Sequence, residues 1–282
     1  MQDTTVRCDA VTMAAAEPAA ASYDDELRRR EALREAFGDS SESDSDAPRE
    51  AASSPLVGRA GRERWRWVAV PGVRGLWLCA DFLPSDDQLR LLAAIQREGW
   101  FSDASNQAMR FGDLPPWAVE LSALVRECIC IGDVDVGISP GWTNEDEDAC
   151  PLPSDLLWRE PLFDQLIANR YTPGEGICAH VDLMRFDDGI AIVSLESACV
   201  MNFSRECAAY DTQNTQKHGE SESTNVPVYL NPGSLVVLSG DARYHWKHEI
   251  NRKPGAQLWN GRELEQHRRT SVTLRKLKAS PN

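Results

Sequence analysis

The feature that most constrains the fold is a series of short β-prone runs, each bounded by turn signals, in the second half of the chain. The runs are residues 165–171, 189–196, 198–204, 226–230, 234–239 and 270–277. Short strands separated by Gly- and Pro-containing turns are typical of antiparallel sandwiches and barrels. The polar stretch 205–225, which separates two of the runs, is expected to be a mobile surface insertion.

Two amphipathic helices are expected before these strands. The first covers residues 86–98, with Ser85 as its N-cap and Gly99 at its end, and the second covers residues 116–128. Two β-prone runs precede them, starting at Trp65, and residues 131–153 read as a surface loop. Helices followed by many strands favour a helical cap on a β-sandwich or barrel.

The N-terminal residues differ sharply in composition from the rest. Residues 1–58 are rich in Ala, Ser, Asp and Glu, and they hold much of the acidic excess behind a formal net charge of -14. Few of their side chains could be buried in a core, so we expect a disordered leader. Residues 59–282 are expected to form one folded domain, with Arg and Lys in excess near its end, which allows a local basic surface.

The cysteine pattern and the targeting features of the sequence favour an intracellular protein. The 8 cysteines include no C-x-x-C pair, which favours reduced thiols. The chain has neither a secretory signal pattern nor 18 consecutive apolar residues, so no membrane association is expected. We therefore expect a protein of the cytoplasm or the nucleus.

His180 and Asp182 form the first chemically informative pair. On a strand, residues two apart point to the same side, so an imidazole and a carboxylate could grip one metal ion. A His–Asp hydrogen bond at a strand end is the plainer alternative. A third ligand could come from His248 or His245, between which spacing alone does not choose. Two histidines and one carboxylate leave three positions open on iron, which suits a bidentate cosubstrate and O2.

Polar and apolar side chains alternate along the run RRTSVTLR near the end of the chain. Those expected on one face are Arg269, Ser271, Thr273 and Arg275. Two guanidiniums on this face could bind a dianion such as 2-oxoglutarate. The alternative is an edge strand with an exposed charged face, but the apolar residues Val272 and Leu274 on the other side favour an internal strand.

Several segments together resemble the AlkB family of iron(II)/2-oxoglutarate dioxygenases. They are N-x-Y-x-P-G-x-G-I-x-x-H-x-D starting at Asn169, IVSLESACVMNF, PGSLVVLSGDARYHWKHEI and RRTSVTLR, in that order. The resemblance covers residues 75–277, and within the family it is strongest to the tRNA-modifying AlkB-homologue-8-type branch. It implies a mainly β fold with some α structure: a double-stranded β-helix, or jelly-roll, core with N-terminal flanking helices.

The resemblance also assigns site residues. It implies Fe(II) bound by His180, Asp182 and His248, and thereby selects His248 over His245. It implies 2-oxoglutarate bound by four residues: Asn169, Tyr171, Arg269 and Arg275. With O2 as the third reactant, the implied reaction is an oxidation that turns 2-oxoglutarate into succinate and CO2.

The implied substrate is an alkylated or modified base in RNA, tRNA included, or in DNA, which would be hydroxylated or demethylated. Candidate substrate contacts are Arg110, Phe111, Arg185 and Arg243. The first two lie in a segment that forms part of a nucleotide-recognition lid in relatives. One alternative is the same chemistry on a protein side chain or a small metabolite, which suits the acidic charge. Another is a non-catalytic interaction module with an AlkB-like shell.

Overall fold

The computed structural model describes residues 65–102, 105–135, 150–205 and 224–279. The expected leader, residues 1–58, lies outside these ranges, so its disorder and the boundary at residue 59 stay predictions.

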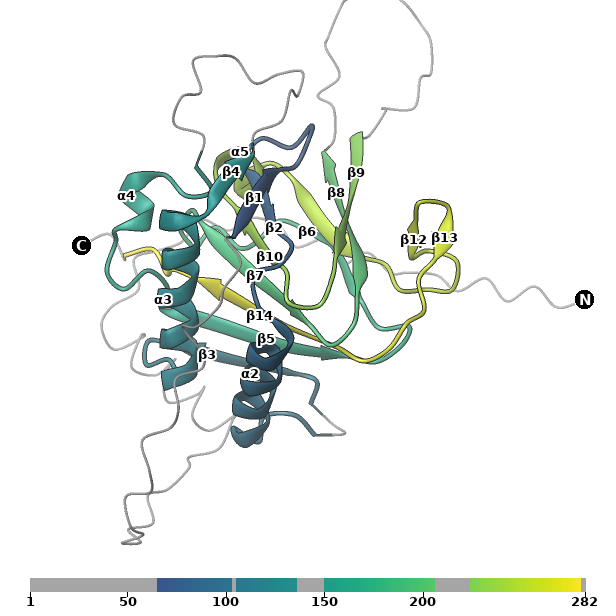
Figure 1. The fold of residues 1–282 in the computed structure, drawn as a ribbon, viewed down its shortest axis with the longest axis horizontal. Coiled ribbons are helices and arrows are strands. Elements are labelled where there is room, and N and C mark those ends of the chain that lie inside the picture. The colour runs from purple at the N-terminus through teal and green to yellow at the C-terminus, as the bar shows by residue number, and fades with distance from the viewer. Residues whose placement is uncertain (1–64, 103–104, 136–149, 206–223, 280–282) are drawn as a thin grey trace, which may run out of the picture. The chain divides into compact units, whose positions relative to one another are not determined.

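Most strands belong to a large sheet, here called the major sheet, with the order β3-β5-β14-β7-β10-β2-β1-β4 (Figure 1). Its strands are β1 Arg66–Ala69, β2 Leu76–Cys79, β3 Gln107–Phe111, β4 Asp133–Asp135, β5 Gln165–Tyr171, β7 Ile190–Leu195, β10 Leu235–Leu238 and β14 Arg269–Arg275. Neighbouring strands are antiparallel except β1 and β4, which run parallel.

A second, four-stranded sheet, here called the minor sheet, has the order β6-β11-β8-β9. Its strands are β6 Ile177–His180, β8 Cys199–Arg205, β9 Thr224–Leu230 and β11 Lys247–Ile250. A small hairpin, β12 Leu258–Trp259 and β13 Arg262–Glu263, follows β11. Apolar side chains from both sheets pack together in one buried cluster, for example Ile192 and Val236 against Phe203 and Val228. The two sheets therefore form a sandwich.

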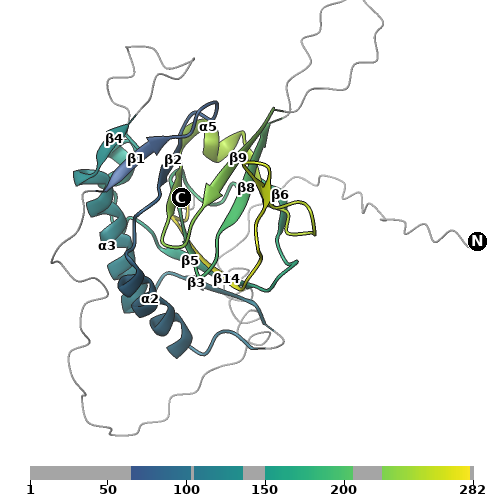
Figure 2. The ribbon, with the colours of Figure 1, turned by 45° about the vertical axis from the view of Figure 1, so that its right-hand side comes forward.

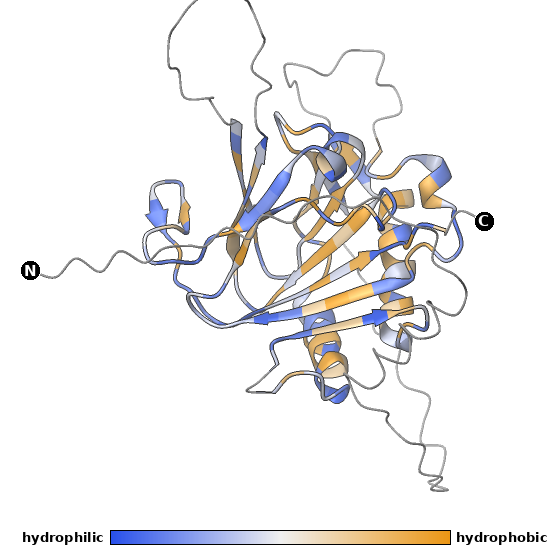
Figure 3. Cartoon of the chain, turned by 180° about the vertical axis from the view of Figure 1, so that it is seen from behind, coloured by the Kyte–Doolittle hydropathy of each residue, from blue (hydrophilic) through white to orange (hydrophobic). Residues whose placement is uncertain are grey.

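Helices cover the other face of the major sheet. The two helices on this face are α2 Ser85–Arg97 and α3 Pro116–Ile131. The described part of the chain also has two shorter helices, α4 Ser154–Leu157 and α5 Gly240–Tyr244. Figure 2 shows α2 and α3 on one side of the major sheet, with the minor-sheet strands on the other side. Leu91 and Leu121 from the helices share a buried cluster with Val193 and Val272 from the strands. The central strands are thus buried on both faces, and Figure 3 shows hydrophobic colour along them.

The expected fold class is confirmed, and the six predicted β-prone runs are strands whose ends shift by at most two residues. Of the expected insertion 205–225, residues 206–223 lie outside the described part of the chain, and the residues at its two ends belong to β8 and β9. Among the described residues, no helix combines the length and the apolar character needed to cross a membrane.

The structure differs from three local predictions. Ser85 is the first residue of α2 rather than its cap: Pro84 precedes the helix, and no side chain caps it. The second helix runs on to Ile131, because Ile129 and neighbouring apolar side chains keep packing against the core. The start of the expected loop 131–153 contains β4, a short polar strand at the sheet edge, where the backbone N–H of Asp133 donates to the Trp65 carbonyl. Residues 136–149 of that loop lie outside the described part of the chain, so this part of the prediction stays a prediction.

Candidate metal and cosubstrate site

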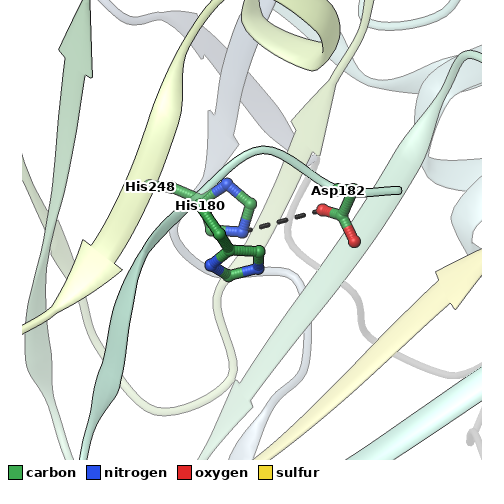
Figure 4. Close-up of side chains that lie close together, drawn as sticks. All are labelled: His180, Asp182 and His248. Atoms are coloured by element: carbon green, nitrogen blue, oxygen red, sulfur yellow. Dashed lines mark ion pairs between the residues drawn. The ribbon is translucent and has the colours of Figure 1, made fainter. Parts of the chain in front are cut away.

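Two histidines and an aspartate converge between the two sheets (Figure 4). His180 ends β6 and His248 lies on β11, and the antiparallel register places these two residues directly opposite each other. One ligand atom each from His180, Asp182 and His248 lies within 4.8 Å of the others. The Nε2 atom of His248 is 3.7 Å from Oδ2 of Asp182. A pairing between distant strands thus assembles a compact group of three metal-binding side chains.

Strand alternation is not what places Asp182, contrary to expectation. Strand β6 ends at His180, and Asp182 lies in the segment that follows. Its carboxylate is held from another strand, because Nη1 of Arg275 on β14 lies 2.8 Å from Oδ1. The other carboxylate oxygen, Oδ2, faces His248. The ion pair leaves this oxygen available to a metal ion.

The structure distinguishes the two histidines between which spacing could not choose. His245 follows α5 as its C-cap residue and is exposed. His248, three residues later, is 5% exposed and belongs to the group of three. The geometry therefore favours His248, as the family resemblance does.

The surroundings of both imidazoles suit metal binding. Nδ1 of His180 is 2.9 Å from the Cys178 carbonyl oxygen, which can only accept, so Nδ1 donates to it and Nε2 is the nitrogen left to bind a metal ion. Burial lowers the pKa of His248 to about 4, although the Asp182 carboxylate opposes this change. A neutral imidazole offers a lone pair rather than a proton. Two imidazoles and one carboxylate form the donor set typical of non-haem Fe(II) sites with open positions.

A cavity of about 330 Å³ lies beside this group. It is lined by the three residues above and by the four predicted cosubstrate residues: Asn169, Tyr171, Arg269 and Arg275. Strand β14 is internal, paired with β5 on one side and β7 on the other, so the edge-strand alternative is wrong. Val272 and Leu274 point into the core under the helices, and the polar residues alternating with them face the cavity.

Arg269 has unused hydrogen-bonding capacity at this cavity. The residue is 1% exposed, and its Nη2 donates to Oγ of Ser194 at 2.8 Å. Its Nε and Nη1 have no hydrogen-bond partner among the described residues, and its guanidinium lies 5.6 Å from the centre of the Tyr171 ring. A buried guanidinium is costly unless an anion pairs with it. The donors left over fit a carboxylate such as that of 2-oxoglutarate.

Arg275 lies six residues further along β14, at the metal end of the cavity. Its guanidinium pairs with Asp182 and lies 4.6 Å from the centre of the Phe186 ring. Burial lowers its pKa, against the effect of the Asp182 carboxylate. One strand thus supplies a cation at each end of the cavity.

Two of the predicted substrate contacts do not face this cavity. The Arg110 guanidinium lies 4.6 Å from the centre of the Trp100 ring, and Arg110 is on the face of β3 opposite to Gln107 and Met109, which line the cavity. Arg243 is 1% exposed and donates to the carbonyl oxygens of residues 182, 183 and 186. It therefore braces the backbone that carries Asp182 and is not available to a phosphate.

The exposed lining residues Arg185, Met109 and Leu183 mark the mouth of the cavity, and Phe111, which does not itself line the cavity, lies beside Arg185. Arg185 lines the cavity, and its guanidinium is 5.8 Å from the centre of the Phe111 ring. Phe111 is 47% exposed. Sequence reasoning missed the apolar neighbours Met109 and Leu183, which also line the cavity and are exposed. The mouth therefore offers an aromatic face, one cation and an apolar rim.

Sequence reasoning also missed Ser194 and Gln107. Ser194 is a polar residue inside an apolar strand, and this signal could have pointed to a buried partner such as Arg269. Gln107 carries no such signal, because its partner Asn169 lies on another strand, 62 residues away.

The role of Arg243 can be tested by folding stability. We expect Arg243→Ala to lower the free energy of unfolding by about 2–4 kcal/mol, because buried carbonyls lose a charged donor. The exposed Arg185 provides the matched control, and Arg185→Ala should cost about 1 kcal/mol or less. Urea unfolding of the metal-free protein measures both values, and similar values for both variants would contradict the bracing role.

The model of the 2OG-Fe(II) oxygenase superfamily matches residues 83–275. "Alkylated DNA repair protein ALKBH8 homolog" of Arabidopsis thaliana is 28% identical over 74% of this chain and 60% of its own length. "tRNA (carboxymethyluridine(34)-5-O)-methyltransferase ALKBH8" of Macaca fascicularis is 35% identical over 42% of this chain and 18% of its own length. A solved structure, "The structure of OsALKBH1", aligns over 72% of this chain and 98% of that chain, with a TM-score of 0.43 and 15% identity.

This chain spans about three fifths of the Arabidopsis relative and less than a fifth of the macaque one. The family model, in contrast, covers most of the chain, including all three residues of the metal group and both cavity arginines. The chain therefore belongs to the 2OG-Fe(II) oxygenase superfamily, and it is a 2-oxoglutarate-dependent dioxygenase that uses Fe(II), 2-oxoglutarate and O2.

Proposed function

We propose that this enzyme hydroxylates or demethylates an alkylated or modified base in nucleic acid, either RNA, tRNA included, or DNA. The observation that carries the proposal is the mouth of the cavity, where Phe111 offers an aromatic face backed by the Arg185 guanidinium. A base can stack on such a ring, and the cation suits the charge of a nucleic-acid backbone. The names of the two relatives, which refer to alkylated DNA and to tRNA, add support.

In this proposal each group of cavity residues has its own role. The iron ligands are His180, Asp182 and His248. The distal carboxylate of 2-oxoglutarate pairs with the free N–H groups of Arg269, and Asn169 and Tyr171 add hydrogen bonds. Arg275 orients the Asp182 carboxylate and lies at the metal-chelating end of the cosubstrate. When bound, iron, 2-oxoglutarate and O2 would supply the oxidising power: one oxygen atom of O2 would convert C–H to C–OH, and the other would enter 2-oxoglutarate as it becomes succinate and CO2.

A base must leave its stack to enter the cavity, so single-stranded or loop substrates are expected to be preferred. The protein then has two tasks, to hold the reacting carbon beside the metal and to keep water away from it. The apolar side chains of Met109 and Leu183 at the mouth suit the second task.

The substrate class is tested by separate incubations with total tRNA, other RNA, alkylated oligonucleotides and a proteome extract. We expect a hydroxylated or demethylated nucleoside, detected by mass spectrometry, together with succinate that depends on Fe(II) and 2-oxoglutarate. A product only in the proteome pool, or only on small molecules, would favour the second candidate, to which the net charge of -14 is suited. Absence of succinate in every pool would favour a non-catalytic module.

Binding at the mouth is tested with a single-stranded oligonucleotide. We expect Phe111→Ala and Arg185→Ala each to weaken binding about tenfold, because base stacking on an aromatic ring contributes about 1–3 kcal/mol. Arg110→Ala is the control, since Arg110 lies over Trp100 on the other face of β3, and it should change the affinity less than about twofold. Fluorescence anisotropy at fixed salt measures all three variants. Equal losses in all three would point to a diffuse electrostatic contact instead.

A further inference from the structure

We propose that Gln107 is a positioning residue for the cosubstrate: its side-chain amide fixes the orientation of the Asn169 amide, so that the Nδ2 group of Asn169 faces 2-oxoglutarate. The proposal builds on the cosubstrate part of the proposed function and is independent of which molecule is oxidised.

The contact itself is short and direct. Strands β3 and β5 pair with Gln107 opposite Asn169, and Nε2 of Gln107 donates to Oδ1 of Asn169 at 2.6 Å. Asn169 is 7% exposed, and both side chains line the cavity that contains the metal group. The contact is therefore part of the cavity wall.

An asparagine amide has an accepting oxygen and a donating nitrogen of nearly the same shape, so its hydrogen bonds decide which way it points. Here the oxygen of Asn169 is occupied by the Gln107 donor, and Nδ2 makes no hydrogen bond to the described residues. Nδ2 is therefore free to donate to an anion in the cavity. The reversed amide would turn a lone pair toward the same anion, which would repel it.

Gln107 and Phe111 lie on the same short edge strand, β3. Strand β3 is at the edge of the major sheet and pairs only with β5 among the described strands. Gln107 and Met109 line the cavity, and Phe111 lies on the same face of the strand, at the mouth. One short strand thus carries both the side chain that orients Asn169 and the ring proposed to meet the substrate. The hydrogen bond to Asn169 exists only while β3 is docked on β5.

The test is a double-mutant cycle on 2-oxoglutarate binding. Proteins loaded with Mn(II) in place of iron, so that no turnover occurs, are titrated calorimetrically with 2-oxoglutarate. We expect Gln107→Leu to raise the Kd about fivefold to tenfold, since a hydrogen bond to a charged ligand is no longer oriented. In the Asn169→Ala background, the same substitution should change the Kd less than about twofold, because there is no amide left to orient.

Turnover separates positioning from a general structural defect. We expect Gln107→Leu to raise the KM for 2-oxoglutarate by a similar factor while kcat at saturating cosubstrate stays near the wild-type value. Arg110→Leu, next to Met109 on the outer face of β3, serves as the control for the strand and should leave the Kd unchanged.

The outcomes distinguish this proposal from the assignment of the cavity. Wild-type protein that binds no 2-oxoglutarate would overturn both. Normal wild-type binding combined with an unchanged Kd in Gln107→Leu, or with the same loss in the Asn169→Ala background, would overturn only the role of Gln107.

Discussion

Replacing His248 with alanine is expected to lower turnover about 100-fold or more, whereas His245→Ala should leave it near the wild-type rate. The two histidines are three residues apart, but only His248 is buried in the group with His180 and Asp182. Mutation of a residue that only supports a metal ligand typically lowers metal affinity or activity about 10–100-fold, so loss of a ligand itself should lower turnover by at least the upper value. Fe(II)-dependent succinate formation measures the effect.

Metal content gives a second readout of the same prediction. We expect purified His248→Ala to bind less than one tenth of the iron that the wild type binds, while His245→Ala binds as much as the wild type. Thermal unfolding of the metal-free proteins checks that both variants are folded. If His245→Ala lost iron and His248→Ala kept it, the assignment of the third ligand would be wrong.

Replacing Arg269 with methionine is expected to weaken 2-oxoglutarate binding about 100-fold without destabilising the metal-free protein. Truncating one partner of a buried charged pair costs about 2–5 kcal/mol of binding free energy. In the free protein, however, the Arg269 guanidinium is buried, and its Nε and Nη1 have no hydrogen-bond partner among the described residues. An apolar side chain of similar length removes the free-energy cost of burying this unpaired charge, so the melting temperature should stay the same or rise.

Arg268 is the matched control, because it precedes Arg269 in sequence and its side chain is 64% exposed, paired with Glu196. Arg268→Met should change the 2-oxoglutarate Kd less than about twofold. Calorimetric titration of the Mn(II)-loaded proteins and thermal unfolding of the metal-free ones give the two quantities. A lower melting temperature with unchanged Kd in Arg269→Met would indicate that this arginine serves folding instead.

Most strands of the major sheet and the two long helices could be predicted because their signals are local. The six β-prone runs were found by composition and turn residues, and α2 and α3 by an apolar face with helical spacing. Strand β4 could not be found in this way, because it is a three-residue polar segment that is a strand only through pairing with β1. Similarly, the extension of α3 depends on the core that it meets.

The candidate site was predicted in part for a similar reason. The alternation along β14 indicated which residues share the face with Arg269 and Arg275. Arg243 and Arg110 show the limit of such prediction, because a charged residue looks the same in sequence whether it is exposed or buried. Arg243 has buried carbonyls as partners, and Arg110 has an aromatic ring on the far side of its strand.

The sequence by itself determined the chemistry: a β-rich sandwich with flanking helices, two histidines and a carboxylate suited to iron, and two arginines suited to a dianion. Only the tertiary structure decided how these groups meet. It placed His248 opposite His180 across two strands and held Asp182 by Arg275. It left Nε and Nη1 of Arg269 without a partner among the described residues and joined Gln107 to Asn169. Each of these contacts links residues far apart in the chain, so strand register and burial set them, and local sequence does not record either.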